Sequence, residues 1–261
     1  MNQAMLISKT GMQAQDARLQ AIANNLANVK TPGFKQDRVV FEDLAYRVER
    51  MPGDKVNADT DSPLGIQLGN GTRLVGTSKV FTQGSSEITG SGLDVLIEGQ
   101  GFFQVEMPNG ETGYSRVGKF MPNAERRLVT QQGLPVLPEI TIPDNVINTT
   151  IGANGQVTAV DDGGNTVELG QLQLANFANP AGLLALGDNL FQETVASGAA
   201  VEGEPGIGVF GKLKSGMFEG SNVQVVEEMV DMLATQRAYE MNTKVLSAAD
   251  DMQKQLAQAA R

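Results

Sequence analysis

Both ends of this chain carry the periodicity of amphipathic helices, and this pattern constrains the fold more than any other feature. Near the N-terminus, one column at seven-residue spacing contains Met5, Met12, Leu19 and Leu26. A companion column contains Met1, Ser8, Gln15, Ile22 and Val29. Near the C-terminus, the spacing averages about 3.6 residues, which is the α-helical period. That stripe contains Val223, Val226, Val230, Ala234, Ala238, Met241, Val245, Ala248, Met252, Leu256 and Ala259. The pattern predicts two terminal helices, each with an apolar face to bury.

Local signals place the ends of these helices. We expect the first helix at residues 3–29, because Thr31-Pro32-Gly33 follows and Pro disfavours helix in the residue before it. The last helix is expected to begin at Ser221 as its N-cap, with Gln224 as the reciprocal partner of a capping box. It could then run almost to Arg261.

The centre of the chain has the pattern of an antiparallel β module. Most of the 30 Gly residues lie between the two ends. From about residue 65 to residue 220, short apolar runs alternate with turns such as Pro108-Asn109-Gly110. Before this module, we expect a short strand at 39–41, a short helix at 42–50 and an extended loop at 51–64.

These patterns predict an α+β fold. Its N- and C-terminal helices would pair as a coiled-coil-like inner domain, and its central domain would be all-β and antiparallel. The expected terminal helical assembly domain is formed by residues 1–34 and 221–261. Residues 35–68 would connect it to a central β domain at 69–220.

Composition excludes several classes of function. The chain has no Cys and no His, so it has no thiolate chemistry and no Ser-His-Asp triad. Its formal net charge of −10, with scattered Lys and Arg, argues against nucleic-acid binding. No secretory signal and no apolar run long enough to span a membrane is visible. We therefore expect a cytosolic protein, or one exported without a cleavable signal.

The weak motifs in the chain do not assemble a chemical site. Asn57, Asp59 and Asp61 alternate like the start of a calcium loop, but Ser62 and Leu68 stand where such a loop needs Gly and Glu. Two Gly-x-Gly sequences, at 69–71 and 99–101, do not complete a phosphate-binding motif ahead of a helix and are expected to be turns. The acidic pair at 161–162 precedes Gly-Gly and is expected at a hairpin tip. The sequence predicts no catalytic residue, no cofactor, no metal and no small-molecule substrate.

The terminal helices need more burial than they can give each other. Many residues of the C-terminal stripe are only Ala, and ordering both helices costs a large backbone entropy. Further apolar residues lie off that stripe: Met229, Met232, Leu233, Tyr239 and Leu246. We expect this wide apolar surface to contact neighbouring chains. The alternative is that both helices pack on the β module as ordinary core.

Three segments, in order along the chain, resemble the motifs of bacterial flagellar rod and hook proteins. The N-terminal segment is Ala23-Asn24-Asn25-Leu26-Ala27-Asn28 followed by Thr31-Pro32-Gly33-Phe34-Lys35. The central segment is Gly99-Gln100-Gly101-Phe102-Phe103. The C-terminal segment combines Ser221-Asn222-Val223, Glu227-Glu228-Met229 and Gln236-Arg237-Ala238-Tyr239. The three segments are spread over the whole length of the chain.

Within this family, the chain length and the segment Phe41-Glu42-Asp43-Leu44 resemble the distal-rod branch. Residues Tyr46 to Pro63 resemble an insertion that distal-rod members carry and hook proteins generally lack, and that is linked to a straight, stiff rod. The insertion here is rich in Asp and Pro. It departs in this respect from the insertions expected in the family, which are rich in Gln and Ser. The residues taken as marking it are Tyr46, Pro52, Gly53 and Pro63.

The resemblance implies a structural role without catalysis. Many copies would assemble helically into a hollow, stiff, torque-transmitting distal rod across the periplasm. The flagellar type III apparatus would export the subunits without signal cleavage. Proximal rod proteins would lie below, the hook protein above, and the P and L ring proteins around. The alternatives are a proximal-rod or hook subunit and, remotely, a cell-wall-acting enzyme.

The terminal patterns and motifs together give a set of expected subunit-assembly residues. The helices are expected to form the inner tube, the β domain the outer layer. The set is Met5, Met12, Leu19, Ile22, Asn24, Asn25, Leu26, Asn28, Val226, Val230, Leu233, Tyr239, Met241, Val245 and Met252.

Overall fold

The chain divides into two compact units, and each unit is built from segments that are separate in the sequence. In a computed structural model, residues 3–53, 55–57, 60–61, 63–143 and 145–259 are described. The first unit, the helical unit, consists of Met1–Leu26, Asp37–Ser78 and Gln224–Arg261. The second, the β unit, consists of Ala27–Gln36 and Lys79–Val223.

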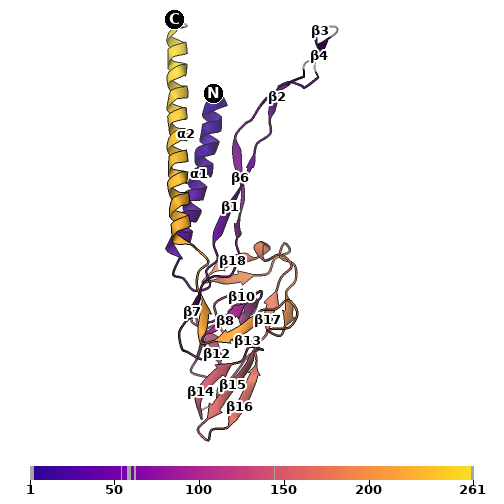
Figure 1. Cartoon of the computed structure of the whole chain (residues 1–261), viewed down its shortest axis with the longest axis vertical. Coiled ribbons are helices and arrows are strands. Elements are labelled where there is room, and N and C mark those ends of the chain that lie inside the picture. The colour runs from indigo at the N-terminus through magenta and orange to yellow at the C-terminus, as the bar shows by residue number, and fades with distance from the viewer. Residues whose placement is uncertain (1–2, 54, 58–59, 62, 144, 260–261) are drawn as a thin grey trace. The chain divides into compact units, whose positions relative to one another are not determined.

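Two long helices run antiparallel in the helical unit (Figure 1). They are α1, Gln3–Ala27, and α2, Val225–Ala259. An ion pair joins Arg18 to Asp231 at 2.9 Å, and Asn25 donates a hydrogen bond to Glu228 at 3.1 Å. The predicted pair of terminal helices is confirmed, and α1 ends two residues before the predicted residue 29.

The predicted start of the C-terminal helix is wrong. Helix α2 begins at Val225, and Gln224 provides the carbonyl that accepts from the amide of Glu228 at 3.0 Å. The Ser221 hydroxyl instead accepts from the amide of Val223 at 3.2 Å. The reason is Asn222, whose side chain accepts from the amide of Gln36 at 2.8 Å and donates to the carbonyl of Val80 at 2.8 Å. These bonds hold Asn222 in the β unit and keep residues 221–223 out of the helix.

The predicted helix at 42–50 is also wrong, because these residues lie in a two-stranded ribbon (Figure 1). Strand β1, Asp37–Asp43, pairs with β6, Thr72–Lys79. Strand β2, Arg47–Arg50, pairs antiparallel with β5, Ile66–Leu68. The expected loop at 51–64 contains one more short pair, β3, Lys55–Asn57, with β4, Thr60–Asp61. Pairing with a distant strand overrides the local helix preference of residues 42–50.

Antiparallel strands build the β unit, as predicted. Its largest sheet has the order β18-β19-β10-β9-β17-β20, with β13 also on β9. These strands are β9 Phe102–Glu106, β10 Thr112–Ser115, β13 Val136–Leu137, β17 Leu174–Asn176, β18 Leu184–Gly187, β19 Leu190–Gln192 and β20 Val201–Gly203. A three-stranded sheet contains β14 Val146–Ile151, β15 Gln156–Asp161 and β16 Thr166–Gln171. The predicted turns at 108–110, 154–155 and 161–164 join neighbouring strands.

Three further strand pairs complete the described part of the β unit. These are β7 Ser86–Ile88 with β22 Met217–Glu219, β8 Val95–Glu98 with β21 Lys212–Ser215, and β11 Phe120–Pro122 with β12 Leu128–Thr130. A single 3-10 turn, η1, covers Pro180–Gly182. The last strands of the unit, β21 and β22, come just before α2 and pair with β8 and β7, which are its first strands. The two ends of the unit therefore lie side by side in its sheets.

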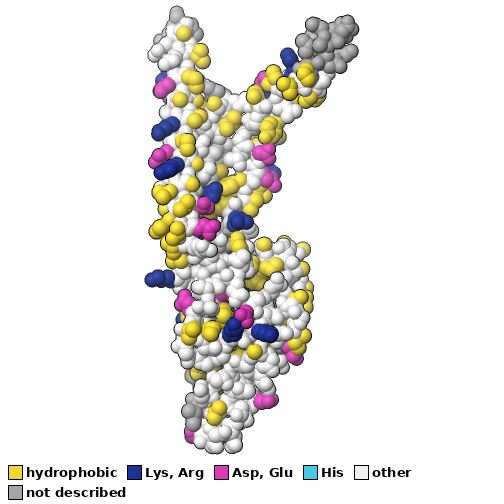
Figure 2. All heavy atoms as spheres, in the orientation of Figure 1, with side chains coloured by type: hydrophobic (Ala, Val, Ile, Leu, Met, Phe, Trp, Pro, Cys, Tyr) yellow, Lys and Arg dark blue, Asp and Glu magenta, His cyan; other side chains and the backbone are white. Residues whose placement is uncertain are grey.

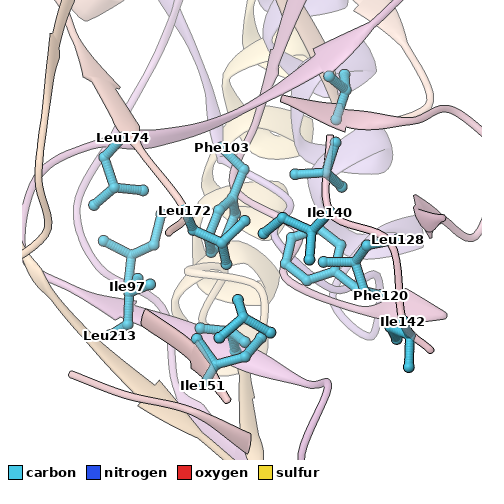
Figure 3. Close-up of a cluster of buried hydrophobic side chains, with 14 residues drawn as sticks. Ile97, Phe103, Phe120, Leu128, Ile140, Ile142, Ile151, Leu172, Leu174 and Leu213 are labelled. Atoms are coloured by element: carbon cyan, nitrogen blue, oxygen red, sulfur yellow. The ribbon is translucent and has the colours of Figure 1, made fainter. Parts of the chain in front are cut away.

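Strand β9 separates two apolar clusters of the β unit. Phe103 lies in the larger cluster with residues such as Ile97 and Leu172 (Figure 3). Phe102 lies in a second cluster with Tyr114 and Phe177. Adjacent residues of a strand point to opposite faces, so the consecutive Phe residues supply both cores.

A buried carboxylate links segments far apart in the β unit. The Nζ atom of Lys35 lies 2.7 Å from Oε1 of Glu219, and Nε of Arg116 lies 2.9 Å from Oε2. The amide of Gly84 also donates to Glu219, at 2.8 Å. Lys35 donates to the carbonyl of Thr82 at 2.7 Å. Burial lowers the pKa of Lys35, Arg116 lowers it further, and Glu219 opposes both. Because the charged groups are almost fully enclosed, each depends on its partners.

This network predicts a large loss of stability when one member is removed. Lys35→Met should destabilise the β unit by about 3–5 kcal/mol, because it leaves a buried carboxylate short of a counter-charge. The matched control is Lys214→Met, which breaks a Lys–Glu pair of the same 2.7 Å length with side chains about half exposed. It should cost about 0–1 kcal/mol. Hydrogen exchange of the β9 amides measures both, and equal losses would contradict the prediction.

The same carboxylate predicts an acid-sensitive β unit. Burial raises the pKa of Glu219, but the charges of Arg116 and Lys35 and the hydrogen bonds outweigh it, so the net pKa is lowered from 4.5. A lowered folded-state pKa gives stability that is fully present above the unfolded value and lost as pH falls through the folded value. Unfolding between pH 7 and pH 2 should therefore show a smaller acid-induced loss in Glu219→Gln, although that variant is less stable at pH 7. An unchanged acid slope would refute this role.

Candidate assembly surface

Most of the side chains that α1 and α2 bury fully are polar or small. The buried residues of α1 are Ser8, Ala14, Ile22 and Asn25, and those of α2 are Glu228, Thr235 and Ala249. A Cβ atom built on Gly11 would lie 3.2 Å from Nδ2 of the Asn242 side chain, so the two helices approach closely there. We call this contact between the two helices the seam. Among the described residues that the helices bury fully, Ile22 is the one large apolar side chain.

The apolar stripe of α2, taken here together with Leu233 beside it, faces away from the seam. Val226 and Leu233 each precede a buried residue, Glu228 and Thr235, by two positions, which turns them about 200° around the helix. Val226 is 76% exposed and Leu233 is 56% exposed. Figure 2 shows hydrophobic side chains along the visible length of α2. Val226 and Leu233 thus point outward, whereas Met232 and Leu246 are half-buried.

The structure separates the predicted assembly residues into two groups. Those of α1 are mostly enclosed: Ile22 and Asn25 are buried, and Met5, Met12, Leu19 and Leu26 are half-buried, as is Asn28 just after the helix. The exposed group consists of Asn24, Val226, Val230, Leu233, Tyr239, Met241, Val245 and Met252. The helical period predicted one apolar face on each helix but did not distinguish inward from outward faces. Met1, in the companion column, lies outside the described residues.

The Asn residues of the N-terminal motif fasten the start of β1 to α1. Asn25 donates to the carbonyl of Asp37 at 3.0 Å and accepts from its amide at 2.8 Å. Asn24 donates to the Asp37 carboxylate at 2.9 Å. Further on, Asn28 accepts from the hydroxyl of Thr31 at 3.1 Å. This motif therefore has a structural function within the chain.

The segment resembling a rod-type insertion forms the far part of the ribbon. Tyr46 is 56% exposed, and Pro52, Gly53 and Pro63 are also exposed. Gly69 lies beside the ring of Tyr46, with its Cβ position 3.5 Å from the ring. Apolar side chains of β2 and β5, including Val48 and Ile66, are exposed as well. A two-stranded ribbon with so much exposed apolar surface is a second candidate surface for a neighbouring chain.

Sequence reasoning missed Arg116 and Glu219. Neither lies in a motif, yet they join Lys35 of the N-terminal motif to the central Gly-Gln-Gly motif. Arg116 donates to the carbonyl of Gly99 at 2.9 Å and to that of Gly101 at 2.5 Å. No local pattern could show that two charged residues so far apart in sequence are buried together.

The described residues hold no group of three or more acidic, His or Cys side chains placed to bind a metal. Asp59 of the calcium-like sequence lies outside the described residues. Asp161 is the last residue of β15, and its carbonyl accepts from the amide of Gly164 at 2.8 Å across the hairpin turn that follows. Among the described helices, none is long and apolar enough to span a membrane.

Three segments of the chain match known protein families. Residues 5–35 match the family described as "Flagella basal body rod protein". Residues 96–159 match "Flagellar hook protein FlgE/F/G D1 domain". Residues 214–259 match "Flagellar basal body rod FlgEFG protein C-terminal". The three matches cover the segments in which the sequence motifs were found.

Full-length relatives agree with these matches. A flagellar basal-body rod protein FlgG from Buchnera aphidicola subsp. Schizaphis graminum is 47% identical over 98% of both chains. One from Agrobacterium fabrum is 47% identical over 95% of this chain and 96% of the relative. One from Borreliella burgdorferi is 43% identical over 97% of this chain and 96% of the relative. This chain therefore belongs to the FlgE/F/G family of flagellar hook and basal-body rod proteins.

Proposed function

We propose that this chain is a structural subunit of the distal flagellar rod, in which many copies form a hollow, stiff shaft that transmits torque across the periplasm. The outward apolar stripe of α2 is the observation that carries the proposal. The three relatives described above are named FlgG basal-body rod proteins, and this favours a rod subunit. The ribbon at residues 46–63 favours the distal rod over the proximal rod or the hook.

Addition of a subunit to the growing rod would remove the stripe from water. Val230 is 60% exposed, Met241 61% and Leu256 70%, so their burial against another copy is favourable. The described residues that α1 and α2 bury fully include one large apolar side chain, that of Ile22. Assembly therefore supplies stability that the single chain lacks, and this couples ordering of the ends to addition of the subunit.

The proposed surroundings follow from this role. The chain is exported by the flagellar type III apparatus without a cleavable signal. It joins proximal rod proteins below and the hook protein above, and the P and L ring proteins surround it. Torque passes through many repeated interfaces, so the function requires neither catalysis nor a cofactor.

The stripe predicts a variant that folds but does not assemble. Val230→Glu combined with Leu233→Glu places two charges on the outward face of α2, where both native side chains are more than half exposed. The stability of the single chain should change by no more than about 0.5 kcal/mol per site. Rod assembly should be lost, because charge would be buried without a partner. Electron microscopy of isolated basal bodies measures the loss.

A matched control is Val167→Glu on β16. Val167 is also exposed, at 42%, but lies in the three-stranded sheet of the β unit. This variant should form rods. Normal rods with the double variant on α2 would refute the proposed role of the stripe.

Removing the far part of the ribbon should change the shape of the assembly without preventing it. Arg47 and Leu68 are paired positions at one end of β2 and β5, so deletion of residues 47–68 leaves β1 and β6 able to pair. We expect assembled filaments that are curved or more flexible, because exposed ribbon contacts between copies are lost. Measured curvature and persistence length test this. Filaments that stay straight and equally stiff would show that the ribbon does not set stiffness.

A further inference from the structure

The methionines of this chain are its most easily oxidised side chains. There are 11 Met and no Cys, Trp or His. A thioether takes up one oxygen atom to become a sulfoxide, and this changes a flexible apolar side chain into a polar one. Where the thioethers lie therefore decides what oxidation would do to this protein.

Three methionines lie exposed on α2. Met229 is 50% exposed, Met241 61% and Met252 54%, whereas Met107 in the β unit is only 7% exposed. Met241 and Met252 lie on the stripe and are eleven residues apart, so they point within about 20° of each other on the helix. Met229 lies beside the stripe and points about 120° away from Met241. Val245 follows Met241 by four residues, and Leu256 follows Met252 by four residues, so each lies on the same face as its methionine.

We propose that Met229, Met241 and Met252 are sites of reversible oxidation by a peroxide, and that their sulfoxides block addition of the subunit to an assembly. The inference rests on the proposed function of the stripe and names a chemical control of that surface. In the reaction, the sulfur forms a bond to one peroxide oxygen, the O–O bond breaks, and water leaves. The sulfur loses two electrons, and the peroxide gains them.

The geometry separates the effect on assembly from the effect on folding. In the single chain the three thioethers already contact water, so a sulfoxide there costs little. In an assembly that covers both the stripe and Met229 beside it, a sulfoxide loses its water and needs a hydrogen-bond donor. The same burial would protect the thioethers of subunits already in place. Oxidation therefore acts on free subunits and leaves completed assemblies intact.

The first test is accessibility. The purified full chain is treated with hydrogen peroxide, and sulfoxides are mapped by mass spectrometry over time. Met229, Met241 and Met252 should convert at least about ten-fold faster than Met107, with the helical circular dichroism unchanged. Conversion at the same rate as Met107, or loss of helix on conversion, would overturn the inference. Recovery of the thioethers by methionine sulfoxide reductases A and B should reverse the modification.

The second test is assembly in cells of the native host that lack their own copy of the gene. Met→Gln at 229, 241 and 252 imitates the polarity of the sulfoxide, and Met→Leu at the same positions keeps the apolar surface. The Leu variant should form rods, and the Gln variant should reduce rods per cell by about ten-fold or more. The matched control is Met121→Gln, because Met121 is 45% exposed but lies on β11 in the β unit. This control should form rods.

The outcomes distinguish this inference from the proposed function. Normal rods with the Gln variant would overturn the inference. If Val230→Glu with Leu233→Glu still abolished rods, the assembly role of the stripe would stand without the oxidation control. If the charged variant also formed rods, the proposed function of the stripe would fail. A Leu variant that loses rods would also overturn the inference. It would show that assembly needs the sulfur atoms themselves and that an apolar surface is not sufficient.

Discussion

The buried carboxylate of Glu219 is the interaction on which the β unit depends. It lies just before α2, and its two cations come from just after α1 and from the end of β10. Taking a charge out of water is costly unless it is paired and hydrogen-bonded. Loss of Lys35, Arg116 or Glu219 would therefore leave a buried charge without its partner and weaken the β unit. Segments from both ends of the chain are built into the unit in this way.

The network also explains the Gly-Gln-Gly sequence of the central motif. Arg116 uses its remaining donors on the carbonyls of Gly99 and Gly101. These glycines have φ of 120° and 133°, a conformation that side chains other than Gly rarely adopt. A Cβ on Gly101 would also press on Leu174, at 3.2 Å. The motif is thus a support for a buried charge, and its resemblance to a phosphate-binding turn has no bearing on its function.

Sequence alone predicted the elements that depend on local patterns. Terminal helices follow from the 3.6-residue period, and the antiparallel β unit follows from its turns. The helix expected at 42–50 was wrong because Arg47–Arg50 pairs with residues that come much later. The cap expected at Ser221 was wrong because Asn222 binds the β unit. Both errors have one physical cause, since a contact distant in sequence outweighed a local preference.

The assembly surface shows the same limit in another form. Periodicity finds an apolar face, but it cannot say whether that face packs inside the chain or outside it. Here most of the side chains that the two helices bury fully are polar or small, Asn25 is hydrogen-bonded to Glu228, and the apolar stripe of α2 is exposed. That arrangement is unusual for a helix pair that must stand alone, because polar seams exchange water for hydrogen bonds at little net gain. It suits a helix pair that gains most of its stabilisation from apolar burial only when the next copy packs on it. Stability and assembly then depend on the same apolar surface, so a chemical change there affects addition of subunits far more than the fold of the single chain.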